Sequence, residues 1–402
     1  MASIVKRKKS FAVVYTYKNE EGVRKQKWET YYSHEAALKR KLEIDNPIEF
    51  LHNRLVTTTI NDLLDEYIQI YGKLKWSFST YDSRTRLLDN YVRPVLGKVL
   101  LAQADKHVMS RYFAYLRTSG TCSPSEITVF EIYKLLHSVF EQAVHWGYFN
   151  ENIVHHMGFK QPDYGMRKTL SPDEIADYIN HCLKCGNTVQ ALMVHLAFTC
   201  SMRKGEILGL CWDDIDFDKN AISINKELLR VSKDSLSALD ERNIYEKFHS
   251  HVKGSRSMLV LKQPKTMSSI RTIYMTPSLV HHLKTWRDKQ VDIPGTQDGR
   301  KYDLIFTQQN GRPLCPRKCN EEFKHILADL NMPEVVFHSL RHSSTSFKLI
   351  LSGGNIKAVQ GDNGHAQPRM VLSVYAQIND KDRKNLAQEM EARFGSLLTY
   401  KA

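Results

Sequence analysis

The chain has 402 residues, 42% of them hydrophobic and 25% charged, which is ordinary usage for a globular protein with two or three domains. Its 57 Lys and Arg outnumber its 44 Asp and Glu, and the net charge of +13 favours a polyanionic partner, although a solvated basic surface would explain the charge equally well. No run approaches the roughly 18 apolar residues that a membrane span needs, and no hydrophobic signal core follows the basic start, so we expect a cytoplasmic protein without a membrane partner.

The first 52 residues predict a small α+β domain. Aromatic or apolar side chains alternate with smaller or polar ones over residues 11–17, which predicts a strand. A turn sequence separates it from a second predicted strand over 24–32, with Trp28 as the anchor. Ser33 then stands where it would cap a helix through residues 34–44.

Residues 56–158 change to helical periodicity and predict a compact helical bundle. Apolar side chains recur at helical spacing directly after Thr59. Further helices are predicted over 79–91, ending near Pro94, and over 106–117.

Basic residues mark both of these regions. In the first domain they are interleaved with aromatic residues, which favours a sheet that lies in a DNA groove over a basic, partly ordered terminus. In the bundle each basic residue alone is more often a solvated side chain than a phosphate contact. The DNA-binding candidates are Lys6, Arg7, Lys8, Lys9, Arg24, Lys25, Lys27, Arg84 and Arg86.

Residues 158–169 combine Gly, Pro and charge and predict a linker, and a third domain occupies residues 168–398. Ser171 and Glu174 have the spacing of a helix cap at its start. The charged segment 228–257 lies between predicted strands and is a candidate mobile insertion with no assigned role. The other elements expected in this domain are strands at 221–228, 258–265 and 269–276, and helices at about 188–200, 203–211 and from Pro277 onward.

Two patterns suggest metal sites, and neither is specific. Cys182 and Cys185 form a CxxC pair that would bind zinc with Cys315 and Cys319, but the first pair falls inside a helical pattern instead of a short knuckle. The seven cysteines are irregularly spaced, as in a reducing compartment. The acidic run 213–218 lacks the glycine and glutamate of a calcium loop and predicts a turn before a strand. We therefore predict no metal.

Six residues of the third domain suit the cleavage of a phosphodiester. Two arginine forks, which stay protonated, can grip the non-bridging oxygens as charge develops there. A tyrosine can attack the phosphorus, and a lysine can donate a proton to the leaving 5′ oxygen. The six are Arg203, Lys265, His338, Arg341, His365 and Tyr375.

Each of these residues also has a purely structural interpretation. Arg203 has the spacing of an ordinary helical ion pair with Glu206, which we expect to brace the arginine. His338 and Arg341, three positions apart, are predicted to face one side of a helix, with His342 pointing away. His338 and His342 have metal-ligand spacing, but HSLRH lacks the glutamate of HExxH, and a cationic Arg341 disfavours a metal ion.

In order and context these residues resemble the catalytic motifs of tyrosine recombinases, the phage integrase family. The motifs are MRKGE at 202–206, PKT at 264–266, HSLR at 338–341, GH at 364–365 and Tyr375. Each motif alone occurs by chance in many chains, whereas the ordered set is specific. The whole layout also resembles the integrases of conjugative transposons and temperate phages.

The resemblance implies a multidomain, mainly α protein with small β-sheets. A small α+β arm-type DNA-binding domain is expected over residues 1–52, a helical core-binding (SAM-like) domain over 56–158, and a mixed α/β tyrosine recombinase catalytic domain over 168–398. A helix is expected at 383–398, packed either on its own catalytic domain or on a neighbouring protomer.

Tyr375 is the expected nucleophile, unless it is simply buried on the apolar face of VLSVYAQI. We expect His338 to accept its proton, His365 to hydrogen-bond a phosphate oxygen, and Lys265 to be the general acid, with Lys262 as a competing assignment. The 3′-phosphotyrosyl ester keeps the energy of the broken bond, so rejoining needs no cofactor.

We therefore expect a site-specific recombinase that integrates and excises a mobile element. The expected partners are double-stranded DNA, further copies of the chain in a synaptic tetramer on DNA, and an accessory excision or DNA-bending protein. Two alternatives share the fold: a type IB-like topoisomerase without sequence choice, and a catalytically silent DNA-binding protein.

Overall fold

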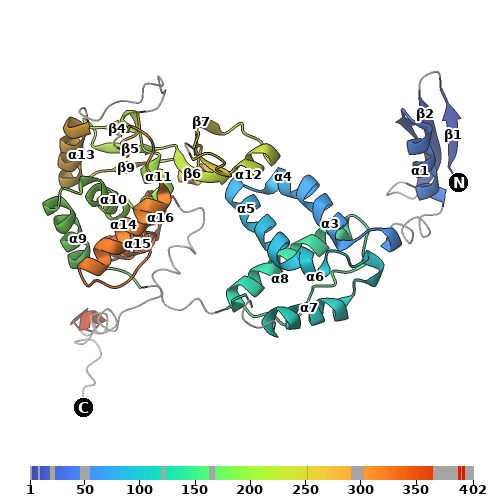
Figure 1. Ribbon diagram of the computed structural model, residues 1–402, viewed down its shortest axis with the longest axis horizontal. Coiled ribbons are helices and arrows are strands. Elements are labelled where there is room, and N and C mark those ends of the chain that lie inside the picture. The colour runs from blue at the N-terminus through green and yellow to red at the C-terminus, as the bar shows by residue number, and fades with distance from the viewer. Residues whose placement is uncertain are drawn as a thin grey trace, which may run out of the picture. The chain divides into compact units, whose positions relative to one another are not determined.

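The computed structural model describes residues 2–7, 10–18, 23–45, 55–118, 124–162, 168–250, 252–290, 303–308, 310–364, 388–390 and 392–393. The chain divides into two compact units, Met1–Asp163 and Tyr164–Ala402. Both are built from helices and small antiparallel sheets (Figure 1). The expected mainly helical architecture with small sheets is confirmed. Within the described ranges, no helix is both long and apolar enough to span a bilayer.

The first unit begins with a three-stranded antiparallel sheet in the order β1 (Ser3–Lys6), β2 (Phe11–Lys18), β3 (Arg24–Tyr31). Helix α1 (His34–Asp45) packs on one face of the sheet, where Val13 and Ala37 are buried. Ser33 Oγ accepts a hydrogen bond from the backbone N–H of Ala36 at 3.1 Å, so the predicted cap is confirmed. Both predicted strands are also present, and β1 is an addition to them.

Glu29 ties α1 to this sheet. Its carboxylate accepts hydrogen bonds from the hydroxyls of Tyr15 and Tyr31 at 2.7 and 2.9 Å and from Nε of Arg40, on α1, at 2.8 Å. The hydrogen bond from Arg40 is the largest of several influences that hold the pKa of Glu29 well below its ordinary value. Trp28 points to the opposite face and is 49% exposed, so the prediction that it anchors the core was wrong.

The helical part of the first unit follows the predicted pattern, and its apolar faces form one core. Thr59 and Asp62 form a capping box at the first helix. The second predicted helix continues through a wider turn at Leu88–Val92 into a short helix that ends at Leu96, two positions beyond Pro94, so its predicted end near Pro94 is confirmed. The helices are α3 (Ile60–Glu66), α4 (Lys73–Lys75), α5 (Phe78–Leu87), α6 (Arg93–Leu96), α7 (Lys106–Thr118) and α8 (Glu126–His145), with additional helical turns at Tyr67–Gly72 and Leu101–Gln103.

The predicted linker 158–169 is not uniform. Phe159 stacks on Tyr133 with ring centroids 4.5 Å apart and meets Phe113 edge-on at 4.8 Å. The first residues of the predicted linker therefore belong to the packed helical region. Residues 163–167 lie outside the described residues.

The second unit has a single large core around α10 (Thr188–Thr199), which is buried on nearly every side. This helix packs against α9 (Pro172–Lys184), α13 (Pro277–Gln290) and α15 (Ser339–Leu351). The predicted cap is confirmed, because Ser171 and Glu174 form a capping box at α9. The remaining helices of the unit are α11 (Lys204–Leu208), α12 (Lys233–Ala238), α14 (Pro316–Asp329) and α16 (Ile356–Asn363).

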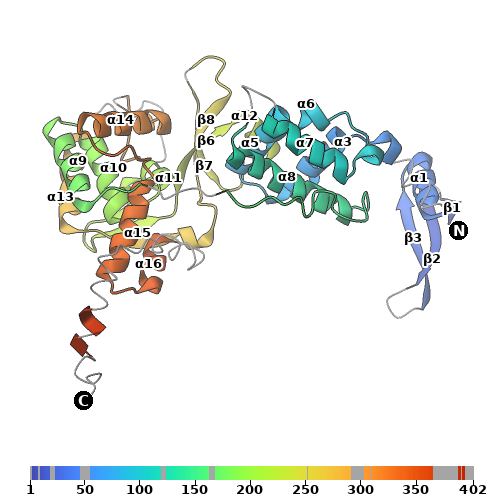
Figure 2. The ribbon, with the colours of Figure 1, turned by 90° about the horizontal axis from the view of Figure 1, so that it is seen from below.

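Its strands form two separate antiparallel sheets. One has the order β4 (Ile215–Asp216), β5 (Ala221–Ile224), β9 (Arg271–Tyr274). The other has the order β6 (Glu227–Ser232), β8 (Ser257–Lys262), β7 (Ile244–Phe248), and Figure 2 shows these three strands side by side. The acidic run 213–218 begins in a helical turn at Trp212–Asp214 and contains β4, so the predicted turn before a strand is present.

Two expectations for this unit change. The predicted strand at 221–228 is divided between β5 and β6, which belong to different sheets. The charged segment 228–257 contains most of β6 and all of α12 and β7, so it is folded into a sheet and is not a loose insertion. Of the helix expected at 383–398, residues 388–390 and 392–393 are helical, and the rest lies outside the described residues.

Candidate active site

Arg203 and Glu206 form the pair that their spacing predicts. Arg203 precedes α11, and its side chain is 32% exposed. Its Nη1 donates to Oε1 of Glu206 at 2.7 Å, and its backbone N–H donates to Oε2 at 2.9 Å. Glu206 is only 2% exposed. Because its carboxylate takes two bonds from one arginine, it holds both the main chain and the guanidinium of Arg203 in place.

A third residue completes this cluster. Arg271, at the start of β9, donates to Oε2 of Glu206 from Nη2 at 3.0 Å and to Oε1 from Nη1 at 3.2 Å. Burial by itself would raise the pKa of Glu206, but the hydrogen bonds and charge of Arg271, followed by the charge of Arg203, outweigh it and lower that pKa. Glu206 is therefore an ionised carboxylate held between two guanidinium groups.

Arg341, in the first turn of α15, is 2% exposed. Its Nη1 donates to the carbonyl of Ser201 and its Nη2 to the carbonyl of Asn363. Burial, followed by the charge of Arg203, lowers the pKa of Arg341 to about 9, so it stays protonated at neutral pH. Ser201, whose carbonyl accepts one of these bonds, has a φ of 50°, a conformation that is costly for a residue other than glycine. The fold thus brings Arg341 beside the segment that carries Arg203.

His338 is the residue that caps α15, and its side chain is exposed. The ring of His342, which was predicted to point away, meets the His338 ring edge-on with centroids 4.9 Å apart. That prediction was wrong because positions four apart on a helix lie one above the other. Arg341 is buried, whereas the side chain of His338 is exposed.

Lys265 and Lys262 lie in different environments. Lys265 is exposed. Lys262, at the end of β8, is 7% exposed and donates to Oε1 of Glu227 at 2.9 Å and to the carbonyl of Gln263. Lys265 ends the predicted strand 258–265, and the next predicted strand begins at 269. The observed strands on its two sides, β8 and β9, belong to different sheets. Its segment is therefore a crossing connection between sheets.

His365 and Tyr375 lie outside the described residues. The residue before His365, Gly364, ends α16 in the left-handed conformation with a φ of 62°. A Cβ on Gly364 would lie 2.8 Å from the carbonyl oxygen of Ser268 and 3.0 Å from Cδ of Arg271. Only glycine fits this close approach, so the chain that leads to His365 is held against the connection that follows Lys265.

Sequence reasoning missed three residues of this site. Ser201 and Asn363 contribute backbone carbonyls, which no residue-type pattern reveals. Arg271 is different, because it lies in the same segment as Lys265 and is a buried arginine, its side chain 6% exposed. Its position within the strand that follows the PKT motif is the signal that would have drawn attention to it.

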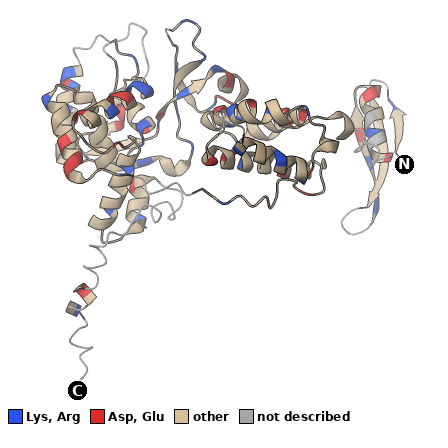
Figure 3. Ribbon diagram, turned by 60° about the horizontal axis from the view of Figure 1, so that its bottom comes forward, with Lys and Arg blue, Asp and Glu red and all other residues tan. Residues whose placement is uncertain are grey.

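The DNA-binding candidates of the first unit have mixed surroundings. The exposed ones on the small sheet are Lys6, Arg7, Arg24, Lys25 and Lys27. Arg7 lies over the Trp28 ring at 5.3 Å, and Arg84 lies over the Trp76 ring at 5.0 Å. Arg86 is exposed, whereas Lys8 and Lys9 lie outside the described residues. Figure 3 shows Lys and Arg spread over every described part of the chain.

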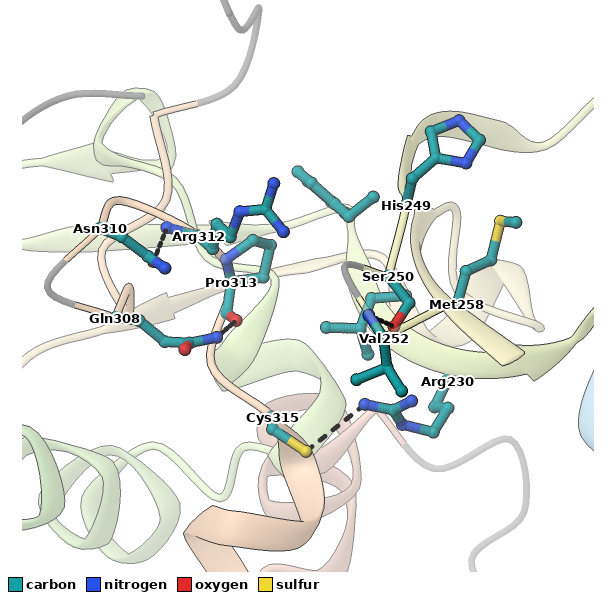
Figure 4. A pocket seen from close by; sticks show the side chains of 12 residues that line it. Arg230, His249, Ser250, Val252, Met258, Gln308, Asn310, Arg312, Pro313 and Cys315 are labelled. Atoms are coloured by element: carbon teal, nitrogen blue, oxygen red, sulfur yellow. Dashed lines mark hydrogen bonds between the residues drawn. The ribbon is translucent and has the colours of Figure 1, made fainter. Parts of the chain in front are cut away.

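A pocket of about 210 Å³ lies apart from these residues, between the β6–β8–β7 sheet and the start of α14 (Figure 4). Arg230 and Cys315 both line it and are in contact, with Nη2 of Arg230 3.4 Å from the sulfur. Burial would raise the pKa of the Cys315 thiol, but the backbone N–H groups of Lys318 and Arg317, together with Arg230, lower it. None of the four candidate catalytic residues that the structure describes, Arg203, Lys265, His338 and Arg341, lines this pocket. In the part of the chain that is described, no three His, Cys, Asp or Glu side chains converge as metal ligands would.

Comparison with known sequences identifies related recombinases and integrases. The Phage integrase family matches residues 168–382, which is more than half of the chain. An XerC-like tyrosine recombinase from Caldanaerobacter subterraneus subsp. tengcongensis is 28% identical over 299 residues, which cover 71% of this chain and 70% of that protein. The ICEBs1 integrase of Bacillus subtilis is 20% identical over 312 residues, 77% of each chain.

Solved structures share the fold. The Tn1549 transposon integrase in complex with transposon right end DNA has a TM-score of 0.65 at 20% identity, covering 83% of this chain and 99% of that one. A lambda integrase tetramer bound to a Holliday junction has a TM-score of 0.55 at 14% identity, covering 94% and 96%. With the family match and the clustered arginines, these similarities show that the chain belongs to the phage integrase family and is a tyrosine recombinase, an enzyme of site-specific recombination.

Proposed function

We propose that this recombinase cleaves one DNA strand with Tyr375, holds it as a 3′-phosphotyrosyl ester and rejoins it to a new 5′ hydroxyl. Tyr375 attacks the phosphorus, and His338 accepts the phenol proton. Arg203, Arg341 and His365 stabilise the charge on the non-bridging oxygens, and Lys265 donates a proton to the leaving 5′ oxygen. No external energy source is needed, because the tyrosyl ester keeps the energy of the broken bond.

One observation carries this proposal. The Arg341 guanidinium bonds to the carbonyls of Ser201 and Asn363, which stand two positions before Arg203 and His365. Three motifs that are far apart in the sequence thus meet at one buried arginine. A guanidinium has five N–H donors, so these two bonds do not exhaust it, and a phosphate can still be bound.

The division of the chain supports the same function. We propose an arm-type DNA-binding domain at residues 1–52, a helical core-binding domain at 56–158 and a catalytic domain at 168–398. Double-stranded DNA is the proposed substrate, and the proposed active assembly is a tetramer of this chain at two sites. The related Tn1549 integrase was solved with transposon DNA and the lambda integrase as a tetramer on a Holliday junction. Integration and excision of a mobile element, with an accessory excision or DNA-bending protein, complete the proposal.

The direct test is to trap the covalent intermediate. The full chain is incubated with duplexes from candidate element ends that carry a nick one or two nucleotides from the cleavage site, so that the released piece diffuses away and rejoining fails. We expect a denaturation-resistant protein–DNA complex on cognate ends and none on shuffled duplexes. Equal trapping on both would favour a topoisomerase, and no trapping on any end would favour a silent DNA-binding protein.

Lys265→Ala is expected to slow cleavage about 100-fold, because a general acid contributes roughly that much or more. The defect should largely disappear on a duplex whose leaving 5′ oxygen is replaced by sulfur, since a thiolate departs without a proton. The measurement is the rate of covalent complex formation on the two duplexes.

Lys262→Met is the matched control for the Lys265 variant. It should lower the thermal midpoint, because Glu227 loses its buried partner, and it should show no selective recovery on the sulfur duplex. If Lys262→Met were rescued by sulfur and Lys265→Ala were not, the two lysine assignments would be exchanged.

Removing residues 1–52 is expected to leave cleavage of a short core duplex within about threefold, while binding to distant arm sites weakens at least tenfold. The sheet carries exposed basic residues, and phosphate contacts of this kind supply most of the sequence-independent affinity. Gel shifts on separate arm and core duplexes measure both effects. Equal losses of affinity for the two duplexes would mean that the sheet also contributes to binding of the core duplex.

A further inference from the structure

Arg271 has an unusually complete set of bonds for a residue outside the recognised motifs. Its Nη1 and Nη2 grip both oxygens of Glu206, at 3.2 and 3.0 Å. Nη1 also donates to the carbonyl of Ser269 at 2.9 Å, and Nε donates to the carbonyl of Asp362 at 2.9 Å. The side chain is 6% exposed. Four of its five N–H donors are thus used within the protein, whereas Arg341 uses two, so Arg271 has little left with which to bind a phosphate.

On one side, these bonds reach Arg203. The carboxylate that Arg271 grips is the one that fixes the backbone N–H and Nη1 of Arg203. The fork of Arg271 and the side chain of Arg203 therefore share Glu206, and neither can rotate without breaking a bond to it. This sets the orientation of the partly exposed Arg203 guanidinium.

On the other side, the bonds reach the end of α16. Asp362, whose carbonyl Arg271 binds, is followed by Asn363, whose carbonyl accepts from Arg341. Gly364 then approaches so closely that an added Cβ would lie 3.0 Å from Cδ of Arg271. The carbonyls of the successive residues Asp362 and Asn363 thus accept hydrogen bonds from Arg271 and Arg341, respectively, just before His365 in the sequence.

We propose that Arg271 is a positioning residue that joins the two halves of the phosphate site. It orients Arg203 through Glu206 and fixes the exit of α16 toward His365, and it does not touch the DNA itself. This inference rests on the proposed function. Arginine is required because a lysine ammonium cannot grip both carboxylate oxygens and a carbonyl in a second direction with one rigid group.

The test compares Arg271→Lys and Arg271→Gln with the wild-type full chain on a nicked core duplex. We expect the rate of covalent complex formation at saturating DNA to fall about 100-fold in both variants, the size of effect that a misplacement of about 1 Å produces. Half-saturating DNA concentration should change less than threefold, because no DNA contact is lost. Lysine, although it keeps the charge, should not restore the rate.

A matched control separates positioning from general stability. Lys226 and Asp214 form another buried ion pair in the same unit, 2.5 Å apart, with side chains 13% and 5% exposed. Lys226→Gln should lower the thermal midpoint about as much as Arg271→Gln, while the cleavage rate of its folded fraction stays within threefold of the wild type. An equal rate loss in both variants would overturn the proposal.

A double-mutant cycle supplies the second measurement. Glu206→Gln removes the carboxylate that Arg271 binds, and so weakens the same interaction as the Arg271 variants. The double variant should therefore cleave no more slowly than the slower single variant. Multiplicative rate losses, or a wild-type rate for either Arg271→Lys or Glu206→Gln, would disprove the inference. Failure of the wild-type chain to form any covalent complex would instead disprove the proposed function, so the two failures are distinguishable.

Discussion

Tyr375→Phe is expected to abolish the covalent protein–DNA complex, with a loss of about 1,000-fold or more, while DNA affinity stays within twofold of the wild type. Only the nucleophilic oxygen is removed, and without it Tyr375 can form no phosphotyrosyl ester. The phenol needs activation at neutral pH because its ordinary pKa is near 10. Denaturing gels on a nicked duplex measure the complex, and gel shifts measure affinity.

Tyr274→Phe is the matched control for the Tyr375 variant. Tyr274 lies on β9 of the same unit and is 75% exposed, so its hydroxyl is available to chance reaction. The control should form the complex at the wild-type rate. Covalent complex persisting in Tyr375→Phe would show that another tyrosine is the nucleophile, and the same experiment on the remaining tyrosines of the catalytic domain would find it.

Glu206→Ala is expected to lower the free energy of unfolding by about 3–5 kcal/mol, the usual cost of removing one partner from a buried ion pair. The change leaves Arg271, buried beside Arg203, without its carboxylate, and leaves the backbone N–H of Arg203 without an acceptor. Urea unfolding at neutral pH, followed by tryptophan fluorescence, measures the loss. Glu206→Ala should also fail to cleave DNA, because the orientation of Arg203 depends on the same carboxylate.

The pH dependence of stability provides a second measure. The pKa of Glu206 is lower in the folded chain than its ordinary value of 4.5, so folding favours the ionised form. The contribution of Glu206 to the free energy of unfolding is fully present above the pKa that this residue has in the unfolded chain. It is lost as the pH falls through the lower pKa that Glu206 has in the folded chain. Between about pH 5 and pH 3, Glu206→Gln should therefore lose stability less steeply than the wild type.

Glu334→Gln is the control for both Glu206 variants. Glu334 pairs with Lys324 at 2.7 Å, but the two side chains are 78% and 52% exposed. Solvent screens an exposed pair of this kind, so this variant should unfold almost as the wild type does at neutral pH. A comparable loss in Glu334→Gln and Glu206→Ala would mean that burial does not distinguish the two carboxylates, contrary to the structure.

The sequence alone predicted the features that depend on residues a few positions apart. The predicted caps at Ser33 and Ser171 are both present, because a cap needs only residues three positions apart. The helical faces and the first two predicted strands also follow from short periodicities. The ordered motifs identified the family without any structure, since a reaction that needs two arginines, a lysine, histidines and a tyrosine constrains residue types along the whole catalytic domain.

Tertiary structure alone decided which residues meet. Trp28 is a large apolar residue, yet strand alternation puts it on the face opposite α1. The strands on the two sides of Lys265 are close in sequence but pair in different sheets. Arg271 and the carbonyls of Ser201 and Asn363 became visible as site residues only through hydrogen bonds that span tens of positions. Periodicity and caps depend on neighbours a few residues away, whereas sheet pairing and the burial of a charge are fixed by the free energy of the whole packed unit.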